Sequence, residues 1–255
     1  METPADFMGL TALITGASSG IGAEIATQLG CHGAYAIIHY HNNLRGATEV
    51  LTHIRQAGGD GELMPADFSN TEAIQQFADS LQQIRNPIDI LVNNAGSLIE
   101  RRPFLQITEE LWSKVFTLNL TSAFLTTQAV LPAMLQRKRG VVVNISSVAA
   151  RFGGGIGAIA YSSAKASLSA MTKGLAREFG PQGIHVNAVS PGTIDTDYHK
   201  KFSTREALDA VVSATPVKRL GTVEEVANLV VFLCSDAARF IQGQVIEVNG
   251  GFLMV

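Results

Sequence analysis

A phenol and an ammonium group lie four residues apart in the sequence, at Tyr161 and Lys165. On a helix this spacing places both side chains on one face, where they can interact. A free tyrosine has a pKa of about 10. A cation within about 4–6 Å favours the phenolate and typically lowers this pKa by about one to three units. The pair could therefore transfer a proton near neutral pH. Because any helix surface can carry these two residues by chance, their surroundings decide the interpretation.

Polar residues follow several apolar segments that have the character of strands. Ser147 comes just after the apolar segment 140–145 and 14 residues before Tyr161. Ligands of an open parallel sheet bind beyond the carboxyl ends of its strands, so these side chains can meet at one edge. The other polar motifs in comparable places are residues 93–96, with the sequence Asn-Asn-Ala-Gly, the helical Asn119, and residues 190–193.

A glycine-rich turn lies between the predicted strand 11–15 and the predicted helix 21–30. Its spacing is Gly-x-x-x-Gly-x-Gly, from Gly16 through Gly20 to Gly22. Glycines allow the backbone to approach a ligand closely, and the helix N-terminus directs unpaired N–H groups at an anion. The turn therefore predicts a phosphate-binding site, with an ordinary strand-to-helix turn as the alternative. It lacks the Gly-Lys-Ser/Thr ending of nucleoside triphosphate hydrolases.

The end of the second predicted strand, 34–40, bears on the choice of dinucleotide. An acidic residue here, about 20 residues after the glycines, favours NAD by accepting from the ribose 2′-OH. The sequence has Tyr40 at that point, followed by His41, Asn42 and Asn43, with Arg45 nearby. These residues can donate to a 2′-phosphate. NADP(H) is therefore favoured, and NAD(H) is the alternative.

Composition excludes several classes of protein. The chain has 255 residues, 46% of them hydrophobic, and a net charge of -3, which argues against binding to nucleic acid. No apolar run approaches the roughly 20 residues that span a bilayer, and the N-terminus has no secretion signal. Cys31 and Cys234 are expected to be buried, inert thiols, and no metal-ligand spacing occurs. We expect a cytoplasmic protein without a metal or a membrane partner.

Short apolar segments alternate with helical periodicity along the whole chain, which predicts one α/β domain over residues 1–255. Several segments are apolar at consecutive positions, as in a parallel sheet covered by helices on both faces. Residues 193–215 lack periodicity and are expected to form a polar substrate lid. The predicted strands are 11–15, 34–40, 62–66, 88–92, 140–145, 184–189 and 244–248, and the predicted helices are 21–30, 44–57, 71–84, 109–130, 160–179 and 223–233.

Taken together, these motifs resemble the short-chain dehydrogenase/reductase (SDR) family, and the resemblance runs from end to end. It implies a Rossmann-type, doubly wound parallel sheet of about seven strands, an NAD(P)(H)-dependent oxidoreductase that interconverts a ketone and a secondary alcohol, and a homotetramer. The resemblance assigns Asn119, Ser147, Tyr161 and Lys165 to a catalytic tetrad. Ser147 is chosen over Ser146 because a Ser-Ser-Val sequence ends this strand in relatives.

The resemblance also assigns a cofactor site. Gly16, Gly20 and Gly22 would frame the pyrophosphate, Asp67 would approach the adenine, Asn93 would support the region, and the backbone after Pro191 would bind the nicotinamide. The full set expected to bind cofactor is Gly16, Ser18, Ser19, Gly20, Ile21, Gly22, Tyr40, His41, Asn42, Asp67, Phe68, Asn94, Ala95, Gly96, Tyr161, Lys165, Pro191, Gly192, Thr193 and Ile194.

The chemistry of this assignment follows from its residues. Reduction of a ketone by hydride builds negative charge on oxygen, which a positioned acid must neutralise. Tyr161 would supply that proton, Lys165 would stabilise the phenolate, and Ser147 would hold the substrate oxygen beside it. Asn119 would hold a water that connects Lys165 to solvent.

The substrate is expected to be a small polar or anionic carbonyl compound, because cations surround the expected cleft. One alternative is a 3-oxoacyl group on acyl carrier protein, with residues 137–139 meeting the acidic carrier. The other is a sugar or sugar acid, held by the polar lid around residues 195–199. The cations are Arg101, Arg102, Arg151, His199, Lys200 and Lys201, and the acids Glu100, Asp195 and Asp197 oppose them.

A hypothesis from another class is a non-enzymatic dinucleotide sensor that regulates a partner. The complete tetrad argues against it, because pseudoenzymes tend to lose the tyrosine or the lysine. The apolar C-terminus, residues 252–255, predicts association between subunits.

Overall fold

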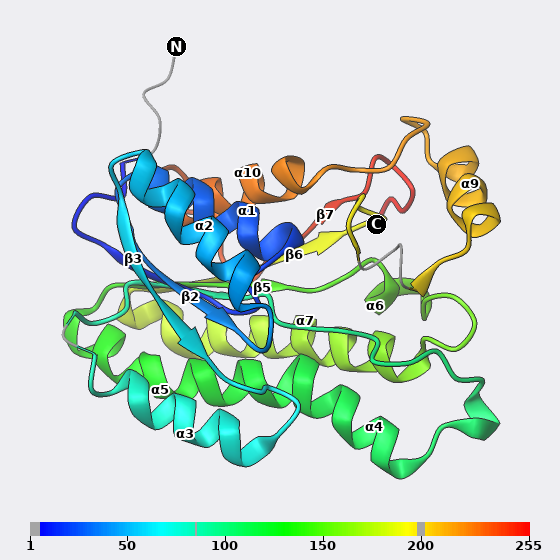
Figure 1. The fold of residues 1–255 in the computed structure, drawn as a ribbon, viewed down its shortest axis with the longest axis horizontal. Coiled ribbons are helices and arrows are strands. Elements are labelled where there is room, and N and C mark those ends of the chain that lie inside the picture. The colour runs from blue at the N-terminus through cyan, green and yellow to red at the C-terminus, as the bar shows by residue number, and fades with distance from the viewer. Residues whose placement is uncertain (1–5, 85, 198–201) are drawn as a thin grey trace.

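The computed structural model describes residues 6–84, 86–197 and 202–255. Within these residues all strands join one parallel sheet in the order β3-β2-β1-β4-β5-β6-β7 (Figure 1). The strands are β1 (Thr11–Ile14), β2 (Tyr35–Tyr40), β3 (Asp60–Pro65), β4 (Ile90–Asn93), β5 (Gly140–Ile145), β6 (Ile184–Pro191) and β7 (Val245–Val248). The predicted α/β architecture with about seven parallel strands is confirmed. The strand order reverses between β1 and β4, where ligands of such sheets bind.

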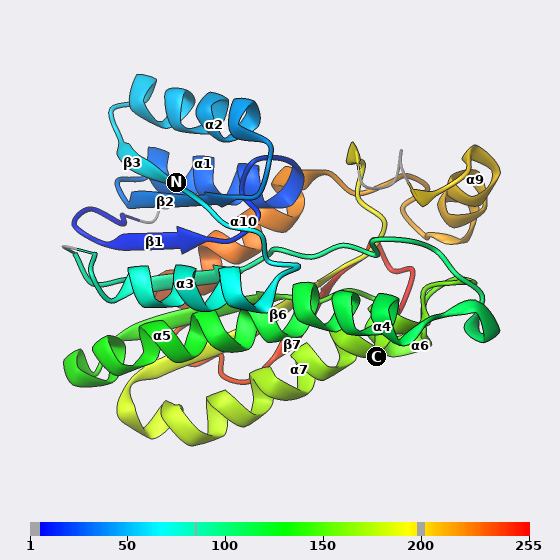
Figure 2. The same cartoon turned by 60° about the horizontal axis from the view of Figure 1, so that its bottom comes forward.

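Helices cover both faces of the sheet, as the apolar strands predict (Figures 1 and 2). One face is covered by α1 (Gly20–Cys31), α2 (Leu44–Gln56) and α10 (Val223–Cys234). The other face is covered by α3 (Thr71–Leu81), α5 (Ser122–Arg137) and α7 (Ile159–Phe179).

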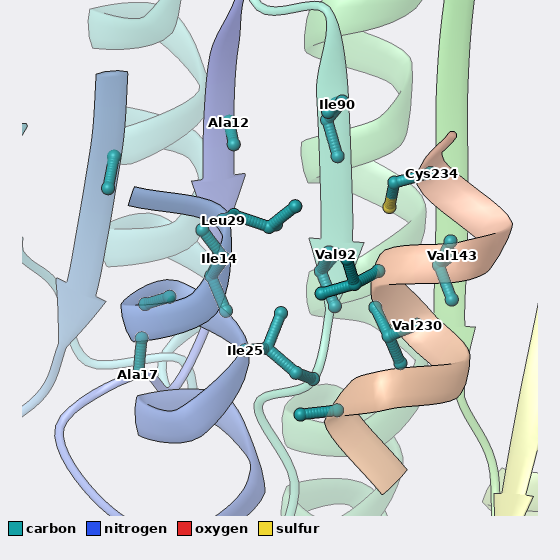
Figure 3. Close-up of a cluster of buried hydrophobic side chains, with 14 of the residues drawn as sticks. Ala12, Ile14, Ala17, Ile25, Leu29, Ile90, Val92, Val143, Val230 and Cys234 are labelled. Carbon is teal, nitrogen blue, oxygen red and sulfur yellow. The ribbon is translucent and has the colours of Figure 1, made fainter. Parts of the chain in front are cut away.

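The two hydrophobic cores lie on opposite sides of the sheet. Ile14 of β1 packs in the cluster under α1, α2 and α10, whereas its neighbour Leu13 packs in the cluster under α3, α5 and α7. Successive residues of a strand point to opposite faces, so an unbroken apolar strand serves both layers. In Figure 3, Ile25 and Leu29 of α1 approach Val230 and Cys234 of α10 above the strands.

Local signals set several helix ends. Asn70 caps α3, and Thr108 accepts from the Leu111 N–H at 3.1 Å as the N-cap of α4 (Glu109–Phe116). The Thr222 side chain accepts from the Glu225 N–H while the Glu225 carboxylate accepts from the Thr222 N–H, which forms a capping box at α10. Gly58, with φ of 90°, follows α2 as the predicted stop.

The helix predicted over 109–130 is longer and interrupted. It consists of α4, one π-helical turn at Thr117–Thr121 and then α5. By length and composition the run Glu109–Arg137 could cross a membrane, but α5 packs on α3 and β5 as a helix of the core does.

The segment 193–215 differs from the prediction. It contains the helix α9 (Arg205–Ala214), which stands apart from the sheet beyond its carboxyl edge (Figures 1 and 2). The Thr204 side chain caps this helix by accepting from the Ala207 N–H at 3.2 Å. A short helix, α6 (Ala149–Phe152), is a second element that the sequence reasoning missed.

The two cysteines differ in exposure. Cys234 is buried, as predicted, and burial raises the pKa of its thiol to about 12. Cys31 is only half-buried, which corrects the expectation of a buried thiol, and burial raises its pKa as well. Both thiols therefore stay protonated at neutral pH. Among the described residues no group of three His, Cys, Asp or Glu side chains gathers to hold a metal.

Candidate active site

A cavity of 880 Å³ opens at the carboxyl ends of the strands. It runs from the glycine turn and the end of β2, past the ends of β4 and β5, to α6 and α9. The cavity contains both the predicted phosphate-binding turn and the Tyr161–Lys165 pair. Most of the expected catalytic and cofactor residues, far apart in sequence, therefore share one space, whereas Asn119 and Tyr40 do not line it.

The glycine turn lies against the end of β4 so closely that side chains would not fit. A Cβ on Gly16, where φ is 64°, would lie 2.9 Å from the Cα of Ala95. A Cβ on Gly22 would lie 2.3 Å from Nδ2 of Asn94. That Nδ2 donates to the carbonyls of Thr15 and Gly16 at 2.9 and 3.0 Å, so Asn94 clamps the turn to β4.

The N-terminus of α1 is prepared for an anion. Ser19 is the N-cap residue and makes no side-chain capping bond, and the first turn of α1 has no acidic residue. The first N–H groups of a helix have no partner within the helix and carry a partial positive charge. All six residues predicted from this turn line the cavity: Gly16, Ser18, Ser19, Gly20, Ile21 and Gly22.

The end of β2 reaches the cavity only in part. His41 and Asn42 line it, together with Asp67 and Phe68 after β3. Tyr40 was expected there, but it is absent from the lining and packs against the hydrophobic core, because its position on β2 points the ring away. Burial works against ionisation of Asp67, but hydrogen bonds from Ser69 outweigh it and lower the pKa of that carboxyl.

Two of the residues considered as 2′-phosphate donors have other partners. The Asn43 side chain accepts from the Gly46 N–H at 3.1 Å, which caps α2, and donates to the Ser18 carbonyl at 3.0 Å. Arg45 pairs with Glu49 at 2.8 Å. His41, whose Nε2 lies 3.8 Å from the Asp67 carboxylate, and Asn42 remain as the donors that face the cavity.

Lys165 is buried beside Tyr161 on α7. Its Nζ lies 5.8 Å from the centre of the Tyr161 ring and donates to the Ile145 carbonyl at 2.7 Å. Burial lowers the pKa of Lys165 to about 8. A Cβ on Gly96 would lie 2.9 Å from Nζ, so only glycine lets the chain pass over the ammonium.

Asn119 is brought to the same place by the π-helical turn. Its Nδ2 donates to the carbonyls of Val115 and Ser97, both at 2.8 Å, and its Oδ1 accepts from the Ser97 N–H at 3.1 Å. A wider turn frees the Val115 carbonyl from its usual backbone partner four residues on. The freed carbonyl holds the side chain of Asn119, which in turn holds the loop after β4.

The two adjacent serines after β5 have different surroundings. The Ser146 side chain is buried and bonds to the Lys165 carbonyl and to Ser169 on α7, at 3.1 and 2.7 Å. Ser147 is half-buried at the cavity, and its Oγ accepts from the Ala149 N–H at 3.1 Å. Accepting one bond leaves the Ser147 hydroxyl proton available to donate, which fits the choice of Ser147.

Two neighbouring motifs lie on different sides of the site. Asn94, Ala95 and Gly96 line the cavity, whereas the Asn93 side chain donates to Thr127 and Asn144 in the buried interior. Asn93 therefore supports the sheet rather than the cavity. The expected residues at the end of β6 all line it: Pro191, Gly192, Thr193 and Ile194.

The end of the cavity opposite the glycine turn has a large apolar part, beside the polar residues Thr196, Ser203 and Thr204 of the expected lid. α9 contributes Leu208 and Val211, and the rings of Phe152 and Phe252 meet edge-on with centroids 5.8 Å apart. Sequence periodicity could have indicated this face of α9, since Leu208, Val211 and Val212 have helical spacing after a Thr204 cap. The apolar residues at this end are Leu98, Phe152, Ile156, Phe202, Ala207, Leu208, Val211 and Phe252.

The expected field of cations around the substrate is largely paired. Arg102 pairs with Glu100 at 2.6 Å and Arg151 with Glu247 at 3.1 Å. Arg101 does line the cavity, and its guanidinium donates to the carbonyls of Phe202 and Ile156 at 2.7 and 3.0 Å. His199, Lys200 and Lys201, with Tyr198 of the expected lid, lie outside the described residues.

Comparison with known proteins finds relatives that cover nearly the whole chain. Residues 16–253 match the family model described as Enoyl-(Acyl carrier protein) reductase. The 3-oxoacyl-[acyl-carrier-protein] reductase FabG of Aquifex aeolicus is 38% identical over 95% of this chain and 97% of its own. A putative NAD(P) dependent gluconate 5-dehydrogenase from Beutenbergia cavernae, with bound NADP, is 34% identical, with a TM-score of 0.92 over 98% of this chain and 99% of its own.

A third relative is named as an enzyme that acts on a steroid. The structure of a 7α-hydroxysteroid dehydrogenase with NADH and 7-oxo glycochenodeoxycholic acid is 34% identical to this chain. Its TM-score is 0.90, over 98% of each chain. Proteins similar to this one over their whole length therefore act on quite different substrates.

Proposed function

Because the chain belongs to the short-chain dehydrogenase/reductase family, we propose that it is an NADP(H)-dependent enzyme that interconverts a ketone and a secondary alcohol. The observation that carries the proposal is the shared cavity. Tyr161 and Lys165 line the same space as the open N-terminus of α1 and the glycine turn. A proton-transfer pair and a phosphate site at the two ends of one cavity suit a dinucleotide that spans between them.

The residues present fit such a cofactor. Gly16 and Gly22 let the turn pack against the end of β4, and the uncapped N–H groups at the start of α1 would receive the pyrophosphate. His41 and Asn42 would donate to a 2′-phosphate, the loop of Asp67 would lie along the adenine, and the backbone of residues 191–194 would lie along the nicotinamide. When bound, the cofactor supplies or accepts the hydride.

Tyr161 would act as the general acid in the reduction direction. Its hydroxyl gives a proton to the oxygen on which negative charge develops, and the phenolate that remains is stabilised by the Lys165 ammonium. Ser147 would donate a hydrogen bond to the same oxygen. In the oxidation direction the phenolate takes the proton back.

Asn119 would keep this pair supplied with protons. Three of its hydrogen-bonding positions are used by Val115 and Ser97, and one lone pair of Oδ1 remains. A water held there would bridge toward Lys165. Gly96 lies between the Asn119 amide and the Lys165 ammonium, and a Cβ on it would lie close to both.

The apolar end of the cavity favours a 3-oxoacyl thioester as the substrate. Leu208, Val211 and the Phe152–Phe252 pair would cover an acyl chain. Each buried methylene contributes about 0.8 kcal/mol, or about a fourfold gain in kcat/KM. NADPH oxidation measured with 3-oxoacyl thioesters of increasing length should therefore rise steeply until the compartment is full. Equal rates for all lengths would contradict this assignment.

A sugar acid is the second candidate, supported by Arg101 at the cavity and by the similarity to the gluconate 5-dehydrogenase. Turnover of gluconate-type acids with NADP, and none of any 3-oxoacyl ester, would favour it. Wild-type protein that binds neither NADPH nor NADH would overturn both candidates and the enzyme itself.

Acyl carrier protein as the carrier of the 3-oxoacyl group is also part of the proposal. The cations considered for it, residues 137–139, lie at the start of β5, whereas Ser147 follows its end. Arg137 is engaged with Asp89 and the Ile88 carbonyl. This cluster therefore lies at the opposite end of β5 from the cavity.

A cytoplasmic homotetramer completes the proposal. Large apolar side chains stay exposed on the single subunit, among them Phe240 and, at the C-terminus, Met254 and Val255. Such residues gain most from burial between subunits. Light scattering at low concentration should show an assembly larger than a monomer.

A further inference from the structure

His39 is a buried histidine whose ring is fixed on every side. Only 2% of the residue is exposed. Its ring stacks on Phe68 with centroids 3.8 Å apart and meets the edge of Phe77 at 5.1 Å. The residue stands at the end of β2, next to the cavity, yet the proton-transfer chemistry gives it no role.

The two ring nitrogens join two parts of the cofactor site. Nδ1 accepts from the Gly16 N–H at 2.9 Å, and Nε2 lies 3.1 Å from the Ala66 carbonyl. Because the backbone N–H can only donate, Nδ1 must be unprotonated, and Nε2 must carry the proton that bonds to Ala66. The backbone carbonyl of His39 accepts from the Ala17 N–H at 2.8 Å as well.

The surroundings keep this tautomer. Burial is the main cause that lowers the pKa of His39 to about 4, and the neighbouring His41 lowers it further, while the bond to Ala66 opposes both. The ring therefore stays neutral at physiological pH. A charged ring would place a donor on Nδ1 against the Gly16 N–H, and the bond would break.

We infer that His39 is a positioning residue for the dinucleotide. Its imidazole fixes the phosphate-binding turn at Gly16 and the adenine loop at Ala66 relative to each other. Gly16 begins the turn that would hold the pyrophosphate, and Ala66 precedes Asp67 and Phe68 on the loop that would follow the adenine. The bond to Gly16 bears on the cofactor affinity, because it fixes the N–H of the turn at Gly16, whereas Asn94 holds only the carbonyls of Thr15 and Gly16. The inference rests on the proposed function.

Two substitutions separate the two bonds of the ring. In His39→Asn, Oδ1 can take the place of Nδ1 and accept from Gly16, while the bond to Ala66 is lost. In His39→Gln, Nε2 can take the place of the histidine Nε2 and donate to Ala66, while the acceptor for Gly16 is lost. His39→Leu removes both bonds and fills the space with an apolar side chain. The matched control is His53→Asn, on the exposed surface of α2.

The experiment measures the Kd of NADPH by calorimetry, with kcat at saturating cofactor and the melting temperature. An unsatisfied buried donor is costly, so His39→Gln and His39→Leu should raise the Kd by about tenfold or more. His39→Asn should stay within about threefold of the wild type and of His53→Asn. All four should keep kcat within about twofold, since no group at the reacting oxygen changes. Equal Kd values for Asn and Gln, or a fall in melting temperature without any change in Kd, would overturn the inference.

A measurement on the wild type stands apart from the variants. Among the six histidine rings, nitrogen NMR of labelled histidine at pH 7 should show that of His39 as a neutral imidazole with its proton on Nε2. A ring protonated on Nδ1, or charged, would overturn the inference even if no variant folds. Wild type that binds neither NADPH nor NADH would overturn the proposed function instead, and the NMR result would still report on the ring.

Discussion

The two ends of the cavity are built in different ways. At the cofactor end, backbone groups form the surface, and the half-buried side chain of Asn94 and the buried side chain of His39 hold them in place. At the substrate end, apolar side chains from α6, α9 and the C-terminus form much of the surface. The first end is suited to one fixed ligand, and the second can change its specificity by substitution without disturbing the first.

Loss of the phenolic hydroxyl should have the largest effect and should leave both ends intact. Tyr161→Phe removes the proton donor, and general acid–base catalysis typically contributes about 10²–10⁴-fold. Turnover should fall by that factor in steady-state assays, while the Kd of NADPH measured by calorimetry stays nearly unchanged. Residual activity above about a tenth of the wild type would remove Tyr161 from the mechanism.

A methyl group at the cofactor end should be the next most damaging change. In Gly22→Ala the new Cβ would meet Asn94 Nδ2 at 2.3 Å and the Gly16 carbonyl at 2.5 Å, so the turn must shift. We expect the Kd of NADPH to rise at least about tenfold, equivalent to about 1.4 kcal/mol. Gly174→Ala on α7 is the control, because its Cβ would meet nothing within 4 Å and should stabilise the helix by about 0.5–1 kcal/mol. Similar affinities for the two variants would contradict the tight approach.

A polar group at the substrate end should act on the substrate alone. Leu208→Asn places an amide on the cavity face of α9, and loss of a leucine contact costs about 1–3 kcal/mol. KM for a long 3-oxoacyl thioester should rise about tenfold, with the Kd of NADPH unchanged. Ala210→Asn, on an exposed position of the same helix, serves as the control. An equal effect on both ligands would mean that the two ends are coupled.

A change in pH should act on the stability of the fold rather than on turnover. The folded protein keeps His39 neutral down to a pKa of about 4, whereas the unfolded chain protonates it near 6.5. The unfolded state therefore binds more protons between these values, and stability falls as pH falls from about 6.5 to about 4. Relative to wild type, His39→Asn should lose about 2–3 kcal/mol of this dependence in urea titrations. Parallel curves for the two proteins would exclude a neutral His39.

The same contrast explains what could be predicted from the sequence. The glycine turn, Tyr161 with Lys165, and β5 are local patterns, and the structure gives β5 the predicted bounds. Residues 191–194 and 94–96 followed from their place at strand ends. These features depend on residues close together in the chain, where spacing carries the information.

What was missed depends on contacts between distant segments or on small departures from regular geometry. The Arg151 charge is paired with Glu247, 96 residues away, so the sequence overstated the positive field at the substrate. Tyr40 turns to the core, because alternation along β2 decides its direction, while His39 before it takes up the role at the cofactor end. The helical periodicity of residues 109–130 did not indicate the π-helical turn.

That turn makes the number of residues in the helix a constraint of its own. One extra residue per turn advances the helix by about 100° relative to a regular one. Upstream, α4 faces α7, and downstream, α5 faces α3. Removal of any one residue between 117 and 121 would rotate one half against the other, so that Asn119 and the α3 contact could not both be kept. The number of residues in this helix is therefore fixed by the rotation that it sets between α4 and α5. The identity of most side chains in the turn is not fixed in this way.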